Sequence, residues 1–548
     1  MFQYRLRLCK RLKPCSRDVS KRCISNTKPA VDTDDYTCLT TSRYLRVDHI
    51  SSKKSTLVQH ISATQPLLAS LESELSPQYC IVVLSLLAVC SAAMFNVIRK
   101  PRSNNLSSRH LRQTHVETVK TTSFTPVLHI DAAKTVALSG LHLGNEGCIY
   151  VCEKLSSSEV CSSIDLSGNS IDPIGAVALA TLISSNRTIT HIDIRQNNLC
   201  NSGAKLIAKS LGNKNCNVCS INLSANCIGD EGACEIARAV TKNTSLTHLD
   251  LGGNNIQDKG LVALAEALSF NCTLKSCNLS GNYFGNAGFN ALSSTLRVNK
   301  GLTEISLSGT SMTNRCLGFL CQGLLEHAGI RTLALANNNL GPKGAAALAE
   351  VLSAESTILD LNIAGNQLGD FGCEALGEAI CLSRVMARLN VSCNSVGSRG
   401  LDACTKLLCA NSQLEKLELG FNPLGHANLT NFSDAVTFHS NLHTLSLEWS
   451  KLGNSGAASL SKILLYNSTL KNISLRGNNI TDEGCLALSQ ALQVAPIELE
   501  CLDMSYNKIT DPGAFALGKA VRSNTDLNIK CLKLSNNPIS ECVNLVCA

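Results

Sequence analysis

The sequence predicts an α/β solenoid of about fifteen strand-helix repeats, with a parallel sheet lining the inner side of a horseshoe and helices covering the outer side. Two observations carry this prediction. A unit of about 28 residues recurs from residue 136 to residue 532. Within each unit, the apolar side chains change from a two-residue spacing to a helical spacing. The composition agrees, because 44% hydrophobic but only 4% aromatic residues describe a core of aliphatic and small side chains.

Residues 248–274, HLDLGGNNIQDKGLVALAEALSFNCTL, show one unit. Leu249 and Leu251 alternate with polar residues, which predicts a short strand with one buried face. Residues 260–268 then place leucine and alanine at helical spacing, which predicts a helix with one apolar side. One repeat is therefore a strand, a turn and a helix.

The first buried strand residue of each repeat is mostly Leu, Ile or Val. It falls at residues 136, 164, 192, 221, 249, 277, 305, 333, 361, 389, 417, 445, 473, 502 and 532. The steps are 28 residues, apart from 29 twice and 30 once. A single unit of this size cannot cover its own apolar side, so the repeats must stack on one another.

Two further columns recur after each strand. An asparagine follows most strands, and its amide can pair backbone groups that the turning chain leaves open (Asn169, Asn197, Asn226, Asn254, Asn282, Asn338, Asn366, Asn394, Asn422, Asn478, Asn507 and Asn537). A glycine, such as Gly260, then precedes most helices and indicates either a positive φ or a close approach of the backbone. Thr310 and Cys316 break both columns in one repeat, which predicts a local irregularity there.

The pattern of L-x-L, a following Asn and a 28-residue period resembles the leucine-rich repeat. The helical sequences GAAALAEVL, residues 344–352, and GAVALATL, residues 175–182, resemble the ribonuclease-inhibitor class, and most of all the C-terminal repeats of NOD-like receptors. The resemblance covers about residues 135–548 and implies a curved horseshoe whose concave face binds proteins. NOD-like receptors carry an ATP-binding oligomerisation module before their repeats, which residues 1–134 do not match.

The region before the repeats differs in charge. Residues 1–134 hold 20 Lys and Arg against 9 Asp and Glu, a net +11, so the whole-chain +7 leaves the repeats at −4. Residues 1–31 alone hold nine basic residues and one acid, as in a mitochondrial transit peptide or a disordered basic tail. The rest of residues 1–78 is Ser/Thr-rich without a sustained period, which is typical of disorder.

An uncharged stretch follows. Residues 79–98, from Tyr79 to Ile98, are long enough to cross a bilayer core, which takes roughly 20 residues of helix, although a capping helix is the alternative. Basic residues follow this stretch in the linker, residues 99–134, and none lies in residues 59–78. We therefore expect a membrane protein with its repeats in the cytoplasm, with a mitochondrial location as the alternative.

Cysteine usage agrees with a reducing compartment. Of 28 cysteines, 22 lie from Cys148 onward, scattered through the repeats rather than in paired flanking modules. Sequons such as those at Asn243, Asn271 and Asn467 arise from the repeat's own N-x-[ST]-L connector and say little about secretion. The chain's last residues, ECVNLVCA, read as a short repeat without a polar cap, so either a partner covers it or the sequence is incomplete.

No motif predicts catalysis, a metal site or a cofactor. Residues 513–520, GAFALGKA, approach a phosphate-binding loop but lack its final hydroxyl and fit a repeat helix better. Cys216 and Cys219 have zinc spacing without a second pair. His191 and His248 lie two strands apart, roughly 10 Å, too far for one metal centre. We expect no small-molecule substrate and no nucleic-acid partner.

The exposed strand face is where a partner should bind, and two patches stand out. The first is acidic, with Asp165, Asp193 and Asp250 beside the two histidines; it could receive a basic segment, but solvated strand carboxylates are the simpler explanation. The second places three aromatic residues at equivalent positions just after their strands, among charged side chains (Phe421, Trp449 and Tyr506, with Glu418, Glu448, Arg476 and Asp503). Trp, Tyr and Arg dominate binding energy at interfaces. The alternative is that the rings only pack on one another.

We therefore predict a non-catalytic interaction scaffold or receptor-like protein that binds a protein partner on its concave face. One alternative is a GTPase-activating protein, because Ran GTPase activators share this repeat class, although those end in an acidic tail and this chain does not. A cytoskeletal or ciliary scaffold is the other alternative. The fold alone does not choose among them.

Overall fold

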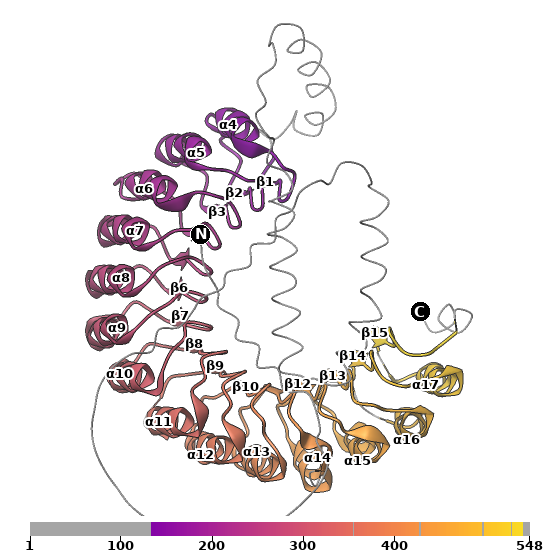
Figure 1. Ribbon diagram of the computed structural model, residues 1–548. Helices are drawn as coiled ribbons and strands as arrows, with labels where there is room; N and C mark the ends of the chain where they lie inside the picture. Colours follow the sequence, from indigo (N-terminus) through magenta and orange to yellow (C-terminus); the bar gives the residue numbers. More distant parts are fainter. Residues whose placement is uncertain (1–132, 354–355, 427–428, 496–497, 528, 541–548) are drawn as a thin grey trace, which may run out of the picture. The chain divides into compact units, whose positions relative to one another are not determined.

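The computed structural model describes residues 133–540 except 354–355, 427–428, 496–497 and 528. These residues form a single parallel sheet whose strands follow one another in chain order from β1 to β15. Figure 1 shows the helices outside the curve of the sheet and the strands lining its inner side. The predicted solenoid of strand-helix repeats is confirmed.

Each strand is three residues long, and all fifteen predicted core residues are the middle residue of a strand. The strands are β1 (Thr135–Ala137), β2 (Ser163–Asp165), β3 (His191–Asp193), β4 (Ser220–Asn222), β5 (His248–Asp250), β6 (Ser276–Asn278), β7 (Glu304–Ser306), β8 (Thr332–Ala334), β9 (Asp360–Asn362), β10 (Arg388–Asn390), β11 (Lys416–Glu418), β12 (Thr444–Ser446), β13 (Asn472–Ser474), β14 (Cys501–Asp503) and β15 (Cys531–Lys533). The buried middle residue faces the helices, so its two neighbours face the inner surface.

One helix follows each of the first fourteen strands. They are α4 (Gly144–Leu155), α5 (Pro173–Ser185), α6 (Cys200–Leu211), α7 (Asp230–Lys242), α8 (Asp258–Phe270), α9 (Asn286–Val298), α10 (Asn314–Leu325), α11 (Gly341–Ser353), α12 (Gly369–Leu382), α13 (Ser398–Ala410), α14 (Leu429–Phe438), α15 (Gly453–Tyr466), α16 (Asp482–Leu492) and α17 (Asp511–Ser523), with a short 3-10 turn η3 (Leu424–His426) before α14. Consecutive helices pack side by side around one continuous aliphatic core.

The asparagine column ties neighbouring repeats together. The Asn254 side chain is buried; its Oδ1 accepts hydrogen bonds from the backbone N–H groups of Asn226 and Ile228 in the preceding repeat, at 3.0 Å each. Its Nδ2 donates to the carbonyls of Leu223, at 3.1 Å, and Leu251, at 2.9 Å. One amide therefore pairs backbone groups of two repeats, which is the structural role predicted for this column.

Thr310 marks the repeat where the column is broken. Its Oγ1 donates to the Leu307 carbonyl of its own repeat at 2.8 Å, and its N–H donates to Asn338 of the next repeat at 2.9 Å. Among the described residues, the Thr310 side chain donates no hydrogen bond to the preceding repeat, whereas the asparagines of the column do. Strand β7 still pairs in register on both sides, so the predicted irregularity is limited to hydrogen bonding.

The glycine column is explained by close approach rather than by positive φ. A Cβ added to Gly260 would lie 2.5 Å from Cγ2 of Ile256 and 2.8 Å from Oδ1 of Asp230. Gly260 lies inside the first turn of α8, and its N–H donates to that Asp230 oxygen at 2.9 Å. A side chain here would push the helix away from the preceding repeat.

Several core cysteines are packed thiols. Burial, the largest cause in each case, raises the pKa of Cys277, Cys321 and Cys485 to about 12. Because the thiolate is the reactive form, we expect iodoacetamide at neutral pH to leave these three unmodified in the folded protein and to alkylate exposed Cys272. Mass spectrometry of the labelled peptides, with a urea-unfolded control, measures this. Labelling of Cys277 at the rate of Cys272 would contradict it.

The expectation of a membrane protein is corrected here. No helix in the part of the chain that the structure describes is long and apolar enough to cross a membrane. The stretch proposed to do so, residues 79–98, lies outside the described residues, as do the basic residues 1–31 and most of the linker. We therefore withdraw the assignment of the protein to a membrane.

Candidate functional site

The three aromatic residues lie in the turns that follow β11, β12 and β14, each four positions after the strand's core residue. All fifteen residues at this position have positive φ, between 51° and 68°. Seven are glycine, which accepts this conformation without cost (Gly140, Gly168, Gly253, Gly281, Gly309, Gly365 and Gly477). Phe421, Trp449 and Tyr506 have φ of 58°, 51° and 58°. A left-handed conformation costs a bulky L-residue roughly 1–2 kcal/mol, so the sequence places rings where the backbone disfavours them.

The rings form a continuous surface, which we call the aromatic ridge (Phe421, Trp449 and Tyr506). The Phe421 and Trp449 rings are stacked, with centroids 6.2 Å apart and an angle of 23° between their planes. Trp449 and Tyr506 are tilted at 50° with centroids 5.8 Å apart. The sequence grouped these three residues into one patch, and in the structure their rings are in contact. Their self-packing also fits the simpler explanation considered for them.

Gly477 explains how Trp449 reaches Tyr506 across an intervening repeat. A Cβ on Gly477 would lie 2.3 Å from Cδ2 of the Trp449 indole. The ring therefore covers the bare glycine of repeat thirteen and contacts the tyrosine of repeat fourteen. Any side chain at Gly477 would displace the indole.

The charged residues beside the ridge are arranged in pairs. The Arg476 guanidinium lies 4.3 Å from the centroid of the Tyr506 ring, a cation-π contact. The Glu448 carboxylate accepts a hydrogen bond from Ser474 at 2.9 Å. At the two ends, Glu418 pairs with Lys416 at 3.0 Å and Asp503 with Lys533 at 3.7 Å. These contacts hold the side chains in place while Tyr506 remains 42% exposed.

The acidic patch at the other end of the sheet is bound mostly by its own backbone. Asp165 and Asp193 are register partners, and each accepts a hydrogen bond from the N–H two residues later, at 2.9 and 3.0 Å. Burial, with smaller contributions from Asp165 and Asp250, raises the pKa of Asp193. Asp250 accepts from Gly252 and from Asn278. These bonds give the carboxylates a structural role in the turns after their strands, whereas the simpler explanation was that they are solvated.

The other motifs of the sequence have structural positions. Residues 513–520 lie inside α17, and Cys216 is a buried thiol in the connector before β4. The described residues contain no group of three or more His, Cys, Asp and Glu side chains placed to hold a metal. Asn243, Asn271 and Asn467, the asparagines of the three sequons, are at most 5% exposed, and their Nδ2 groups donate to carbonyls of the preceding repeat.

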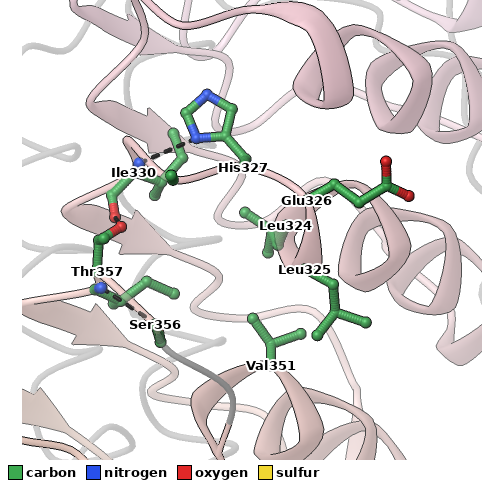
Figure 2. Close-up of a pocket in the computed structure, with 10 residues that line it drawn as sticks. Leu324, Leu325, Glu326, His327, Ile330, Val351, Ser356 and Thr357 are labelled. Carbon is green, nitrogen blue, oxygen red and sulfur yellow. Dashed lines mark hydrogen bonds between the residues drawn. The ribbon is translucent and has the colours of Figure 1, made fainter.

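A separate cavity of about 230 Å³ lies beyond the end of α10, lined by residues such as Leu324, Val351 and Thr357 (Figure 2). His327 stands at its margin where most repeats have asparagine. Its Nδ1 accepts hydrogen bonds from the N–H groups of Gly329 and Ile330, at 2.9 and 3.1 Å. The proton is therefore on Nε2, which is buried without a partner among the described residues. Figure 2 shows Nε2 directed away from Leu324 and Val351.

We expect His327→Asn to stabilise the protein, because Asn299 fills the same position one repeat earlier and donates to both Leu268 and Asn271. The gain should be about 1 kcal/mol and should grow as pH falls. Burial and Lys300 lower the pKa of His327 in the folded state, so the unfolded state binds its proton first and stability is lost below about pH 6.5. Urea midpoints at pH ~8 and pH ~5 measure this; an equal difference at both would contradict the pH dependence.

The chain matches the leucine-rich repeat family in nine segments, residues 162–180, 185–208, 214–237, 242–265, 330–349, 355–377, 438–461, 466–489 and 499–518. The chain therefore contains leucine-rich repeats, which are arranged as the α/β solenoid described above. Repeats of this family indicate an interaction scaffold or a receptor-like fold.

Two solved structures are among those to which the chain is similar. One is TLR13 in a crystal structure of a TLR13–ssRNA13 complex, with 18% identity and a TM-score of 0.41 over 71% of this chain and 61% of that one. The other is actin-binding site 2 of leiomodin-1, with 20% identity and a TM-score of 0.25 over 28% of this chain and 87% of that one. This chain thus spans about 61% of the TLR13 length. No curated protein matches its sequence.

Proposed function

We propose that this protein is a non-catalytic scaffold that binds a protein partner on the concave face of its repeats, with the aromatic ridge as the centre of the contact. The observation that carries the proposal is the contact between the rings of Phe421, Trp449 and Tyr506 at a position whose positive φ favours glycine. Backbone strain persists where something outside local stability maintains it, and binding surfaces are one such place. Glycine at these three positions would give the same backbone without the strain.

The residue types support a protein partner. The ridge joins the only Trp of the chain to a Phe, a Tyr and a stacked Arg, and these aromatic and guanidinium groups are enriched in interface centres. The rings are braced against one another, so a partner would meet a preorganised surface at little cost in side-chain entropy.

We also infer that the repeats belong to the ribonuclease-inhibitor class, as those of NOD-like receptors do. The support is the 28-residue period together with helices of mostly 12 to 14 residues on the outer side. Such helices are wider than a strand, so they spread the outer side and bend the sheet inward. A concave face of this kind can surround a convex partner.

The test is quantitative capture with three forms of the protein. Trp449→Gly combined with Tyr506→Gly removes two rings and suits the positive φ, while Gln196→Gly is the matched control, at the same repeat position with φ 56° on the opposite part of the sheet. We expect a partner retained by the wild type and the control but lost by the double variant, and then direct binding of that purified partner. A partner kept equally by all three forms would reject the ridge.

No observation favours the GTPase-activator alternative, and one assay separates it from the scaffold. Purified repeats are added at substoichiometric amounts to small GTPases loaded with GTP. Release of phosphate at the unstimulated rate is expected of a scaffold. Catalytic stimulation would overturn the non-catalytic assignment.

A further inference from the structure

The first residues of β14 and β15 form a pair of thiols on the inner face of the sheet. Cys501 and Cys531 are register partners on adjacent parallel strands, and both are partly exposed. In this column the other thirteen strands have hydroxyl, amide, imidazole or charged side chains, for example Asn472 of the preceding strand. Neighbouring thiols therefore occur at this position only in the last two described repeats.

Contacts along the same two strands show that their register partners meet. Asp503 and Lys533 lie two residues further on and form the 3.7 Å ion pair, and the hydroxyls of Ser505 and Ser535 are 3.0 Å apart. The equivalent column of other repeats behaves alike, since Arg388 donates to its register partner Asp360 at 2.8 Å. Side chains one strand apart on this face are thus within bonding distance.

The backbone spacing suits a disulfide. Adjacent strands lie roughly 4.8 Å apart, and disulfides join Cα atoms about 4.4–6.8 Å apart. Burial and then the neighbouring Cys531 thiol raise the pKa of Cys501, which indicates that the two thiols interact; Lys533 acts in the opposite direction. Exposure on the open inner face gives a small oxidant access to both sulfurs.

We propose that Cys501 and Cys531 are a redox modification site, at which a small-molecule disulfide oxidises the two thiols to a disulfide that links β14 to β15. One thiolate attacks a sulfur of oxidised glutathione and releases one glutathione thiolate. The second cysteine then attacks the protein sulfur of that mixed disulfide and releases the other glutathione. The two cysteines lose two protons and two electrons, and the oxidant takes up both electrons as it becomes two thiols.

The experiment treats the full chain with oxidised glutathione at mildly alkaline pH, quenches it with acid and maps the sulfur bonds by mass spectrometry. We expect a Cys501–Cys531 bond, with the loss of two hydrogen atoms, that a dithiol reductant reverses. The internal control is the buried Cys373–Cys404 pair, whose sulfurs are 3.6 Å apart. Its inaccessibility should keep it reduced until the protein is unfolded.

The variant Cys501→Ser tests whether the two thiols react with each other or behave as independent surface thiols. Without its partner, Cys531 should accumulate as the glutathione adduct, and the exposed Cys272 should do so in every form. Wild-type protein that carries the adduct on Cys531 to the same extent as the variant would overturn the proposal. So would a bond from either cysteine to a different cysteine in place of the predicted one.

Discussion

Asn254→Ala should be the most destabilising single substitution considered for this protein, with a loss of about 3–5 kcal/mol in the free energy of unfolding. Removing the amide leaves the N–H groups of Asn226 and Ile228 without an acceptor in the interior, while the Leu223 carbonyl keeps only its 3.2 Å hydrogen bond from Asn226. An unpaired buried polar group costs about 1–3 kcal/mol. Urea denaturation followed by circular dichroism measures the change in midpoint.

Two further variants test whether this loss of stability comes from the asparagine column. Asn255→Ala is the matched control, because the neighbouring asparagine is exposed and its loss should change stability by less than about 0.5 kcal/mol. Thr310→Asn should have the opposite sign, since it restores a donor toward the preceding repeat and should add about 1 kcal/mol. Equal effects of Asn254→Ala and Asn255→Ala would show that the column does not hold the repeats together.

Trp449→Gly should weaken partner binding strongly while leaving the repeats stable. Loss of a hot-spot aromatic side chain costs about 2 kcal/mol or more of binding free energy, roughly 30-fold in affinity. In the folded protein, about 1–2 kcal/mol of relieved backbone strain offsets the two lost ring contacts of roughly 0.5–1.5 kcal/mol each. The greater freedom of glycine in the unfolded chain adds roughly 0.5–1 kcal/mol to the loss. The net change in unfolding free energy should be small.

Thermal denaturation and partner titration on the same preparations separate the two roles of the ridge. A binding surface predicts reduced affinity with a nearly unchanged midpoint, and Gln196→Gly should change neither binding nor stability appreciably. If the ridge only stabilises the fold, Trp449→Gly should unfold several degrees earlier and bind the partner normally once folded.

Much of the fold followed from local pattern. The strand core residues, the turn asparagines and the apolar side of each helix repeat at fixed spacing, and each has a direct physical reason in burial or hydrogen bonding. The ridge was also predictable, because its rings fall at one position of the repeat. The positive φ of that position was missed, although seven of its fifteen residues are glycine.

The close approach of Gly260 and the orphan nitrogen of His327 depend on distances between repeats rather than on spacing along the chain. A histidine in the asparagine column looks acceptable in sequence, and His439 does satisfy both nitrogens, with Nε2 2.8 Å from the Asn411 carbonyl. The Nε2 of His327 has no such partner among the described residues.

The sequence by itself determined the repeat, its strand and helix, the side of each that is buried and the position of the aromatic residues, because these depend on periodicity that a single unit already contains. The tertiary structure decided what the stacked units bring together. Strand register placed Cys501 beside Cys531, and the bare backbone of Gly477 let Trp449 reach Tyr506. Contacts between residues about 30 or more positions apart depend on how repeats stack, which no single repeat specifies.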